Sequence, residues 1–568
     1  MSGSLDWTAF LFGSSDPGNA ITVDKPPLSI WIMSLSVRLF GLNSWSLLLP
    51  QAFMGVASVY LLYRIVQKHF GPATGLLSGI FFAVTPVATV IFRYNNPDAL
   101  LTLLMVGIAF FTLESIDRGQ LRWLLLAGVL TGAAFLTKQL QILLLLPSVG
   151  VSYAAFARTS MVRRSLQLAG ALTAAVMAAG WWLLIVQLTD PSKRPFLGGS
   201  RDNSVAELTL GYNGLDRLTG AGANSAIVGE VGKSTEKLEV GFQRFLQPGF
   251  SGQFGWFLPL AIAGIFVSFW YLWRRKGDKT ARALLLFCCV WLSCAVIVVA
   301  YMSGIVHPYY VLTAVPPLCC LAAVAFMHFL KGLRRRRIRI LAGITLAGSM
   351  FFAYISAARS TEDFPGFAGV LLVVWGLVIG AVLVRPPRKV IAQLTTGALL
   401  GALILGPVVW SINTVLSPHI GAGVIGGPDL LGLRSDDREH APPDVLTDLV
   451  SVMYGELPST AQLQRLHATP ASATWVSAVV GSETAANYQL ETGRAVLPLG
   501  GFDGKDPFPT LEQFKDLVDQ GRVGSVLIQR LPPRTLEGRG ESAKIVEWVR
   551  ANFAAEKIDG ADYFPLIK

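Results

Sequence analysis

The sequence predicts a polytopic α-helical membrane protein that ends in a small α/β domain. Of its 568 residues, 52% are hydrophobic and only 15% are charged, whereas soluble globular proteins carry about 25% charged residues. The apolar residues are gathered into runs that are long enough to cross a bilayer, which takes about 20 residues. After about residue 413, short apolar runs alternate with amphipathic stretches, a pattern typical of an α/β domain.

The apolar runs predict about twelve membrane spans. They lie near residues 44–66, 71–91, 98–116, 122–137, 139–157, 166–187, 256–273, 283–302, 309–331, 338–357, 366–384 and 391–412. The pair at 122–137 and 139–157 is short and is interrupted at Thr137-Lys138-Gln139. Because a charge in the middle of a bilayer is costly, we expect Lys138 to lie at a membrane surface.

The basic residues divide the loops between these spans into two sets. One set holds 21 lysines and arginines, whereas the short loops of the other set hold only Arg93, Lys138 and Arg359. Such an excess is typical of cytoplasmic loops. The same basic clusters account for the formal net charge of +11, so we expect membrane lipids and no nucleic acid among the partners.

This orientation predicts three regions. Residues 1–43 form an extracytoplasmic loop whose segment 29–40 is expected to lie along the membrane interface as a helix. Residues 44–412 form the multi-span domain, with an extracytoplasmic loop at 188–255. Residues 413–568 form the extracytoplasmic α/β domain. Its strands are expected at 475–480, 495–501 and 523–529, and its helices at 482–492, 510–520 and 541–553.

Two familiar signals carry no function in this sequence. Gly232-Lys233-Ser234 resembles the end of a phosphate-binding P-loop, but the motif requires a glycine where Ile227 stands. All five cysteines lie within apolar runs, so we expect no disulfide bonds.

Polar residues gather instead at the outer ends of the spans. They are Asp24-Lys25, the segment from Arg93 to Asp98, Thr137-Lys138-Gln139 and the run from His307 to Tyr310. Taken singly, each has a structural explanation: a surface ion pair, a helix N-cap, a solvated loop histidine or interfacial tyrosines. Their position on one side of the membrane favours a shared cleft, and its cations and acids suit a lipid-linked phosphate.

Several motifs resemble glycosyltransferase family 39 and, within it, the bacterial YkcB-like branch. The motifs are Phe10-Leu11-Phe12-Gly13, Ile21 to Pro27, Asn96 to Thr102, Leu136 to Gln139, Gly211-Tyr212-Asn213-Gly214, His307 to Tyr310 and, in the tail, Trp475 to Gly501. The family also includes protein O-mannosyltransferases and aminoarabinose transferases. The resemblance implies a GT-C type membrane fold and a polyprenyl-phosphate sugar donor.

The resemblance also implies roles for individual residues. Lys25 matches a lysine that meets the donor phosphate, and Asp98 matches an acid near the reacting centre or a metal. The candidate catalytic residues are therefore Asp98 and, behind it, Asp24. The candidate phosphate-binding residues are Lys25, His307, Tyr309, Tyr310, Lys138 and Arg93. A divalent cation held by acids fits the family, but the acids present give it no support, so the cofactor stays open.

The family's first acid normally follows a first transmembrane helix, upstream of Phe10-Leu11-Phe12-Gly13. This chain resembles an N-terminally shortened version without that acid, and we expect it to be weakly active or inactive. The function that we expect is transfer of a mannose-like sugar from a polyprenyl-phosphate donor to an extracytoplasmic acceptor at the bacterial plasma membrane. The acceptor class stays open among cell-envelope glycan, lipid and protein. The alternatives are a non-catalytic homologue that binds lipid-linked sugar and, less favoured, a transporter or flippase, since transporters carry polar residues near the middle of the bilayer.

Overall fold

The computed structural model describes most of the chain. The described residues are 6–16, 18–219, 240–274, 278–304, 306–383, 389–419, 421–428, 455–502, 504–529 and 540–567, without the side chains of 389–395. The segment Gly232-Lys233-Ser234 and the basic residues Arg275, Lys276, Arg385 and Arg388 lie outside these ranges.

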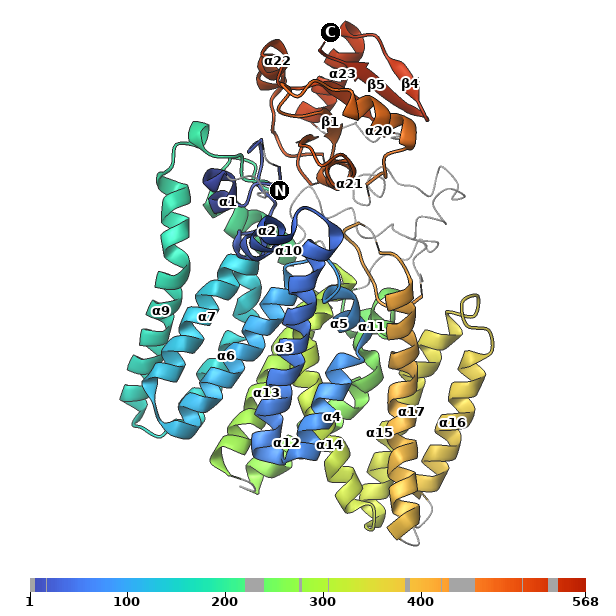
Figure 1. Ribbon diagram of the computed structural model, residues 1–568. Coiled ribbons are helices and arrows are strands. Elements are labelled where there is room, and N and C mark those ends of the chain that lie inside the picture. Colours follow the sequence, from blue (N-terminus) through green and yellow to red (C-terminus); the bar gives the residue numbers. More distant parts are fainter. Residues whose placement is uncertain are drawn as a thin grey trace.

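The membrane domain is a bundle of long helices (Figure 1). Within the described ranges, nine helical stretches are long and apolar enough to cross a membrane. They contain α3 (Ser44–Phe70), α6 (Asp98–Arg118), α7 (Leu121–Lys138), α9 (Met161–Leu188), α12 (Leu258–Trp273), α13 (Lys279–Tyr301), α14 (Val315–Gly332), α15 (Arg336–Ala358) and α17 (Lys389–Leu416). Three shorter apolar helices, α4 (Pro72–Ala83), α8 (Leu146–Phe156) and α16 (Phe367–Leu383), occupy the remaining predicted positions. The chain is a multi-pass membrane protein.

The helices break at two places where the backbone changes direction, one within a predicted span and one at the interruption predicted at Thr137-Lys138-Gln139. The span expected at 71–91 divides into α4 and α5 (Pro86–Ile91), because Pro86 lacks an N–H and holds Thr85 in an extended conformation. The second break lies at Gln139, whose φ of 45° ends α7 and starts the 3-10 helix η1 (Gln139–Leu144). This break places the end of α7 beside the candidate site.

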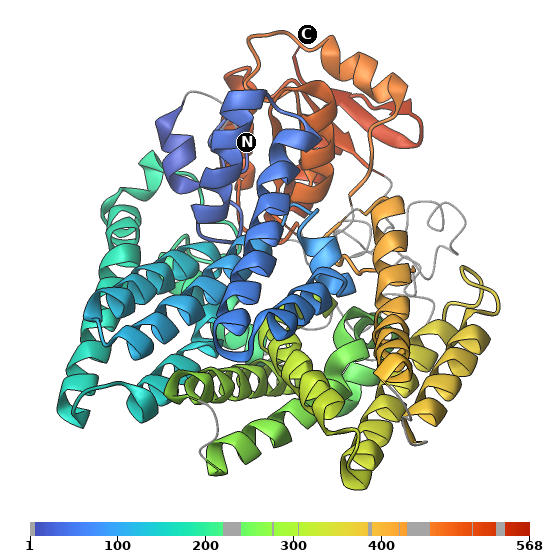
Figure 2. The ribbon, with the colours of Figure 1, turned by 60° about the horizontal axis from the view of Figure 1, so that its bottom comes forward.

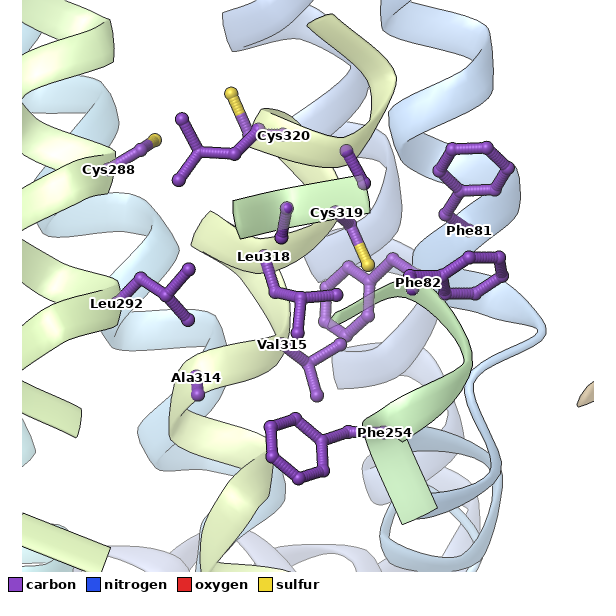
Figure 3. Packing of buried hydrophobic residues seen from close by; sticks show 14 of the residues in the cluster. Phe81, Phe82, Phe254, Cys288, Leu292, Ala314, Val315, Leu318, Cys319 and Cys320 are labelled. Atoms are coloured by element: carbon purple, nitrogen blue, oxygen red, sulfur yellow. The ribbon is translucent and has the colours of Figure 1, made fainter. Parts of the chain in front are cut away.

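The core of the bundle surrounds the stretch Pro308–Gly332, which contains α14 and whose most apolar 18 residues are 94% buried. Figure 3 shows Cys319 and Leu318 of this helix among Phe81 and Phe82 of α4 and Phe254 of α11 (Pro248–Phe254). All five cysteines are free thiols. Since lipid tails are as apolar as the core, packing must hold such helices together, and small residues allow close approach. At Gly264 of α12, an added Cβ would overlap the carbonyl oxygen of Leu321 in α14.

Short helices cover the end of the bundle that carries the candidate site. They are α1 (Trp7–Phe12), α2 (Leu28–Phe40), the π-helix η3 (Glu207–Leu215), α10 (Asp216–Thr219), η4 (Phe242–Leu246) and η6 (Pro308–Ala314). The expected interfacial helix at 29–40 is thus a helix, α2, and its end exposes Leu39 and Phe40. Exposed apolar side chains at this level suit contact with lipid.

The tail forms a five-stranded sheet in the order β2-β1-β3-β5-β4. The strands are β1 (Ser477–Val480), β2 (Val496–Leu499), β3 (Ser525–Ile528), β4 (Glu556–Ile558) and β5 (Ala561–Pro565), and the helices are α20 (Thr460–His467), α21 (Ser482–Thr492), α22 (Leu511–Asp519) and α23 (Glu541–Asn552). β1 pairs in parallel with β2 and β3, and β5 runs antiparallel to β3. The expected strands and helices are present, and α20, β4 and β5 are additional.

The tail domain rests on the loops above the bundle (Figures 1 and 2). Trp475 donates from Nε1 to Oδ1 of the buried Asp16 at 2.8 Å. The ring of Phe508 stacks on that of Phe196 at 5.3 Å. The backbone N–H of Gly199 donates to Oδ2 of Asp506 at 2.9 Å. These contacts join the tail to the first loop and to the loop after α9.

Candidate active site

The first cation of the site, Lys25, lies in the loop that leads into α2. Pro26 and Pro27 follow it and fix the backbone before the helix begins. Nζ of Lys25 lies 2.7 Å from Oδ2 of Asp24 and 2.7 Å from Oδ1 of Asn213. Asn213 also donates from Nδ2 to the carbonyl of Asp24 at 2.9 Å. The side-chain amide of Asn213 therefore fixes both residues of the Asp24-Lys25 pair.

The second cation is Arg217 of α10, which the sequence did not single out. Its guanidinium lies 3.6 Å from Asp24 and donates to the Tyr310 hydroxyl at 2.8 Å. It also lies over the ring of Tyr212, 5.0 Å from the centroid. Arg217 follows Asn213 by four residues, which is one helical turn. A basic residue four positions after Asn213 of the Gly211-Tyr212-Asn213-Gly214 motif is the sequence signal that could have identified Arg217.

The third cation, Lys138, is paired with Asp98 inside the protein. Nζ lies 2.5 Å from Oδ2 of Asp98, and the two side chains are 6% and 1% exposed. Lys138 is the last residue of α7, and the ion pair compensates for the burial of its ammonium group. Asp98 is not the N-cap of α6, because it is the first residue of that helix. Its backbone N–H donates to Oδ1 of Asn96 at 2.8 Å.

Aromatic side chains from η6 join the cations. Tyr310 accepts from Arg217 through its hydroxyl and faces Lys138 with its ring, 4.6 Å from Nζ to the centroid. Tyr309 lies 5.3 Å from the same ammonium, and the buried His307 stacks on Tyr309 at 5.0 Å. Tyr310 therefore links the Asp24 cluster to the Asp98 pair. Three cations and two carboxylates gather here, leaving the cluster positive.

Burial and charge set the protonation of the loop residues. Burial raises the pKa of Asp24, but Lys25 and Arg217 outweigh it and hold the pKa at about 2. Burial lowers the pKa of Lys25 to about 8, against the pull of Asp24. Burial, Arg217 and Lys138 hold the pKa of His307 well below its usual value, so the imidazole is neutral. A bound anion would restore full charge to Lys25, because opposite charge favours the ammonium form.

The remaining predicted site residue, Arg93, contacts α17. Its guanidinium donates to the carbonyl of Thr414 near the end of α17. No three His, Cys, Asp or Glu side chains in the described ranges are arranged to hold a metal ion. Asp24 and Asp98 are both engaged with cations. The described carboxylates therefore do not fit a divalent metal.

Two family models match the chain. Residues 24–183 match the family described as dolichyl-phosphate-mannose-protein mannosyltransferase, and residues 463–552 match the C-terminal region of the "Putative mannosyltransferase YkcB-like" family. Two Bacillus subtilis (strain 168) proteins, "Putative mannosyltransferase YycA" and "Putative mannosyltransferase YkcB", are each 27% identical over 96% of this chain and over 87% and 85% of their own lengths. The chain is homologous to the YkcB-like mannosyltransferases. It is a glycosyltransferase.

A solved structure extends this result to the fold. ArnT from Cupriavidus metallidurans, bound to undecaprenyl phosphate, superposes with a TM-score of 0.52 at 16% identity. The match covers 100% of this chain and 93% of the ArnT chain. The GT-C type fold that the sequence motifs implied is therefore confirmed for this glycosyltransferase.

Proposed function

We propose that the chain transfers a mannose-like sugar from a polyprenyl phosphate to an acceptor hydroxyl on the extracytoplasmic side of the membrane. The observation that carries the proposal is the gathering of Lys25, Arg217 and Lys138 at one end of the bundle. Cations already in place can stabilise the charge that develops on a departing phosphate without reorganising. The ArnT structure, which holds undecaprenyl phosphate in the same fold, supports a lipid phosphate as the ligand.

The transfer is a direct displacement at the sugar. The acceptor oxygen forms a bond to the anomeric carbon and its hydroxyl proton is released to water, while the bond from that carbon to the phosphate oxygen breaks. The electron pair of the broken bond stays on the polyprenyl phosphate, where Lys25 and Arg217 meet it. One displacement inverts the configuration at the anomeric carbon and needs no covalent enzyme intermediate.

The two candidate acids take different parts in this scheme. Asp24, with a pKa of about 2 and two cationic neighbours, is a weak proton acceptor and orients Lys25 and Arg217. Asp98 binds Lys138 through Oδ2, whereas its buried Oδ1 has no hydrogen-bond partner among the described residues. A buried acceptor left unpaired costs free energy. Oδ1 is therefore available to a hydroxyl of the bound sugar.

The proposed function predicts transfer in a purified system. The full chain in liposomes, given mannosyl polyprenyl phosphate with a labelled sugar and a bacterial envelope extract, is expected to release polyprenyl phosphate and to label an acceptor at a low but detectable rate. Glucosyl polyprenyl phosphate in a parallel reaction tests the sugar. Absence of both products with every donor, from protein that still binds polyprenyl phosphate, would favour the non-catalytic alternative.

The extracytoplasmic side of the site gives a separate prediction. Cysteines introduced at the exposed positions Lys193, after α9, and Gln520, after α22, are expected to react with a membrane-impermeant thiol reagent in intact cells. Arg337 at the start of α15 is the matched position on the other side, where labelling is expected only after lysis. The unmodified chain provides the blank for its native cysteines. Labelling of Arg337→Cys but not of the other two would reverse the orientation.

A further inference from the structure

The segment 196–199 of the loop after α9 supports the first loop of the candidate site. The backbone N–H of Thr22 donates to the carbonyl of Phe196 at 2.8 Å. The backbone N–H of Gly198 donates in turn to Oγ1 of Thr22 at 3.0 Å. Thr22 stands two residues before Asp24. These hydrogen bonds therefore hold the stretch of backbone that leads directly into the site.

The last residue of this segment, Gly199, packs closely against the site. Its φ of 82° is a conformation that glycine adopts without strain. A Cβ added at Gly199 would lie 3.0 Å from Cβ of Asp24 and 3.1 Å from the ring of Tyr212. That ring lies 5.4 Å from Nζ of Lys25 and 5.0 Å from the guanidinium of Arg217, measured to its centroid. Any shift of the Gly199 backbone would thus reach the residues that surround both cations.

The tail domain contacts this segment at both of its ends. Oδ2 of Asp506, in the turn that follows β2, accepts the backbone N–H of Gly199 at 2.9 Å. Two residues further along, the ring of Phe508 stacks on that of Phe196 at 5.3 Å. Because a hydrogen bond to a carboxylate is stronger and shorter than one to a neutral acceptor, the Asp506 contact fixes the position of Gly199 closely.

We propose that Asp506 of the tail domain is a positioning residue for the donor-phosphate site, and that it acts through Gly199 on Asp24 and Tyr212. This inference rests on the proposed function. Cations stabilise a departing phosphate best when they are held in place before the donor binds. A docked tail domain would therefore complete the order of the site, although the cations themselves belong to the loops of the membrane domain.

The first test measures binding of polyprenyl phosphate to each full-length variant in liposomes. Asp506→Ala is expected to raise the dissociation constant by about tenfold, which corresponds to about 1.4 kcal/mol. Asp506→Asn keeps an acceptor oxygen and is expected to stay within about threefold of the unmodified chain. The matched control Asp516→Ala removes an exposed acid from α22 and should leave binding unchanged. A purely structural role would lower the amount of folded protein without changing the dissociation constant.

The second test follows hydrogen exchange and requires no ligand. In Asp506→Ala, the backbone amides of Thr22 and Gly198 are expected to exchange faster, because their hydrogen bonds open more often once Gly199 is released. Asp506→Asn should exchange at nearly the rate of the unmodified chain. Unchanged exchange in β1 and β3 would show that the tail domain of Asp506→Ala remains folded.

A variant outside the tail domain tests the other half of the link. Gly199→Ala would press its new Cβ against Asp24 and Tyr212, so it is expected to weaken binding of polyprenyl phosphate while the tail domain stays intact. Normal binding by Gly199→Ala would overturn the inference, as would unchanged binding and exchange in Asp506→Ala. Faster exchange in Asp506→Ala, from a chain that binds no polyprenyl phosphate even unmodified, would support the link and count against the proposed function.

Discussion

Replacing Lys25 by alanine is expected to reduce sugar transfer by a hundredfold or more, the size of effect seen when one group that stabilises developing negative charge is lost. Lys25 is held by Asp24 and Asn213 at 2.7 Å each, so its ammonium is in position before the donor binds. Removing it would leave Arg217 alone with Asp24. The measurement is release of polyprenyl phosphate from mannosyl polyprenyl phosphate, together with binding of polyprenyl phosphate itself.

Two controls make this result specific. Lys193→Ala removes an exposed lysine from the loop after α9 and is expected to leave transfer unchanged. Lys25→Arg keeps the charge but replaces a compact ammonium by a planar fork, so partial activity is expected. Near-normal turnover of Lys25→Ala, at an expression level equal to that of the unmodified chain, would remove Lys25 from the site.

Replacing Asp98 by asparagine is expected to lower turnover by on the order of a hundredfold, because the orphaned Oδ1 would no longer be a charged acceptor. The structure adds a second effect. Lys138 would remain as a buried, unpaired cation, which costs about 3–5 kcal/mol. Both the melting temperature and the turnover per folded molecule should therefore fall.

The double variant Asp98→Asn/Lys138→Met separates stability from chemistry. It removes both charges, and it is expected to recover much of the lost melting temperature, since a buried pair can be replaced at little cost. Turnover should stay low, because the carboxylate and a phosphate-facing cation are both absent. Full turnover per folded molecule in Asp98→Asn would reduce Asp98 to a structural partner of Lys138.

The sequence alone determined where the helices and strands lie and much of the chemistry of the first loop. Apolar runs and turn residues are local signals, so the spans and the elements of the tail from 475 to 553 could be placed with errors of a few residues. Lys25 and Asp98 were found because each belongs to a short motif. The interruption at Thr137-Lys138-Gln139 was predicted from its polar residues. The break at Pro86 was missed, because it changes only a few backbone angles within a run that stays apolar.

Only the tertiary structure decided which charges meet. Lys138 and Asp98 lie 40 residues apart, and Lys25 and Asn213 lie 188 residues apart. Neither pair follows from spacing along one helix, because helix packing and loop closure bring them together. The position of the tail domain depends further on its contacts with the loops, such as that of Trp475 with Asp16. Local sequence encodes which residues are buried, whereas long-range packing selects the partner of each buried charge.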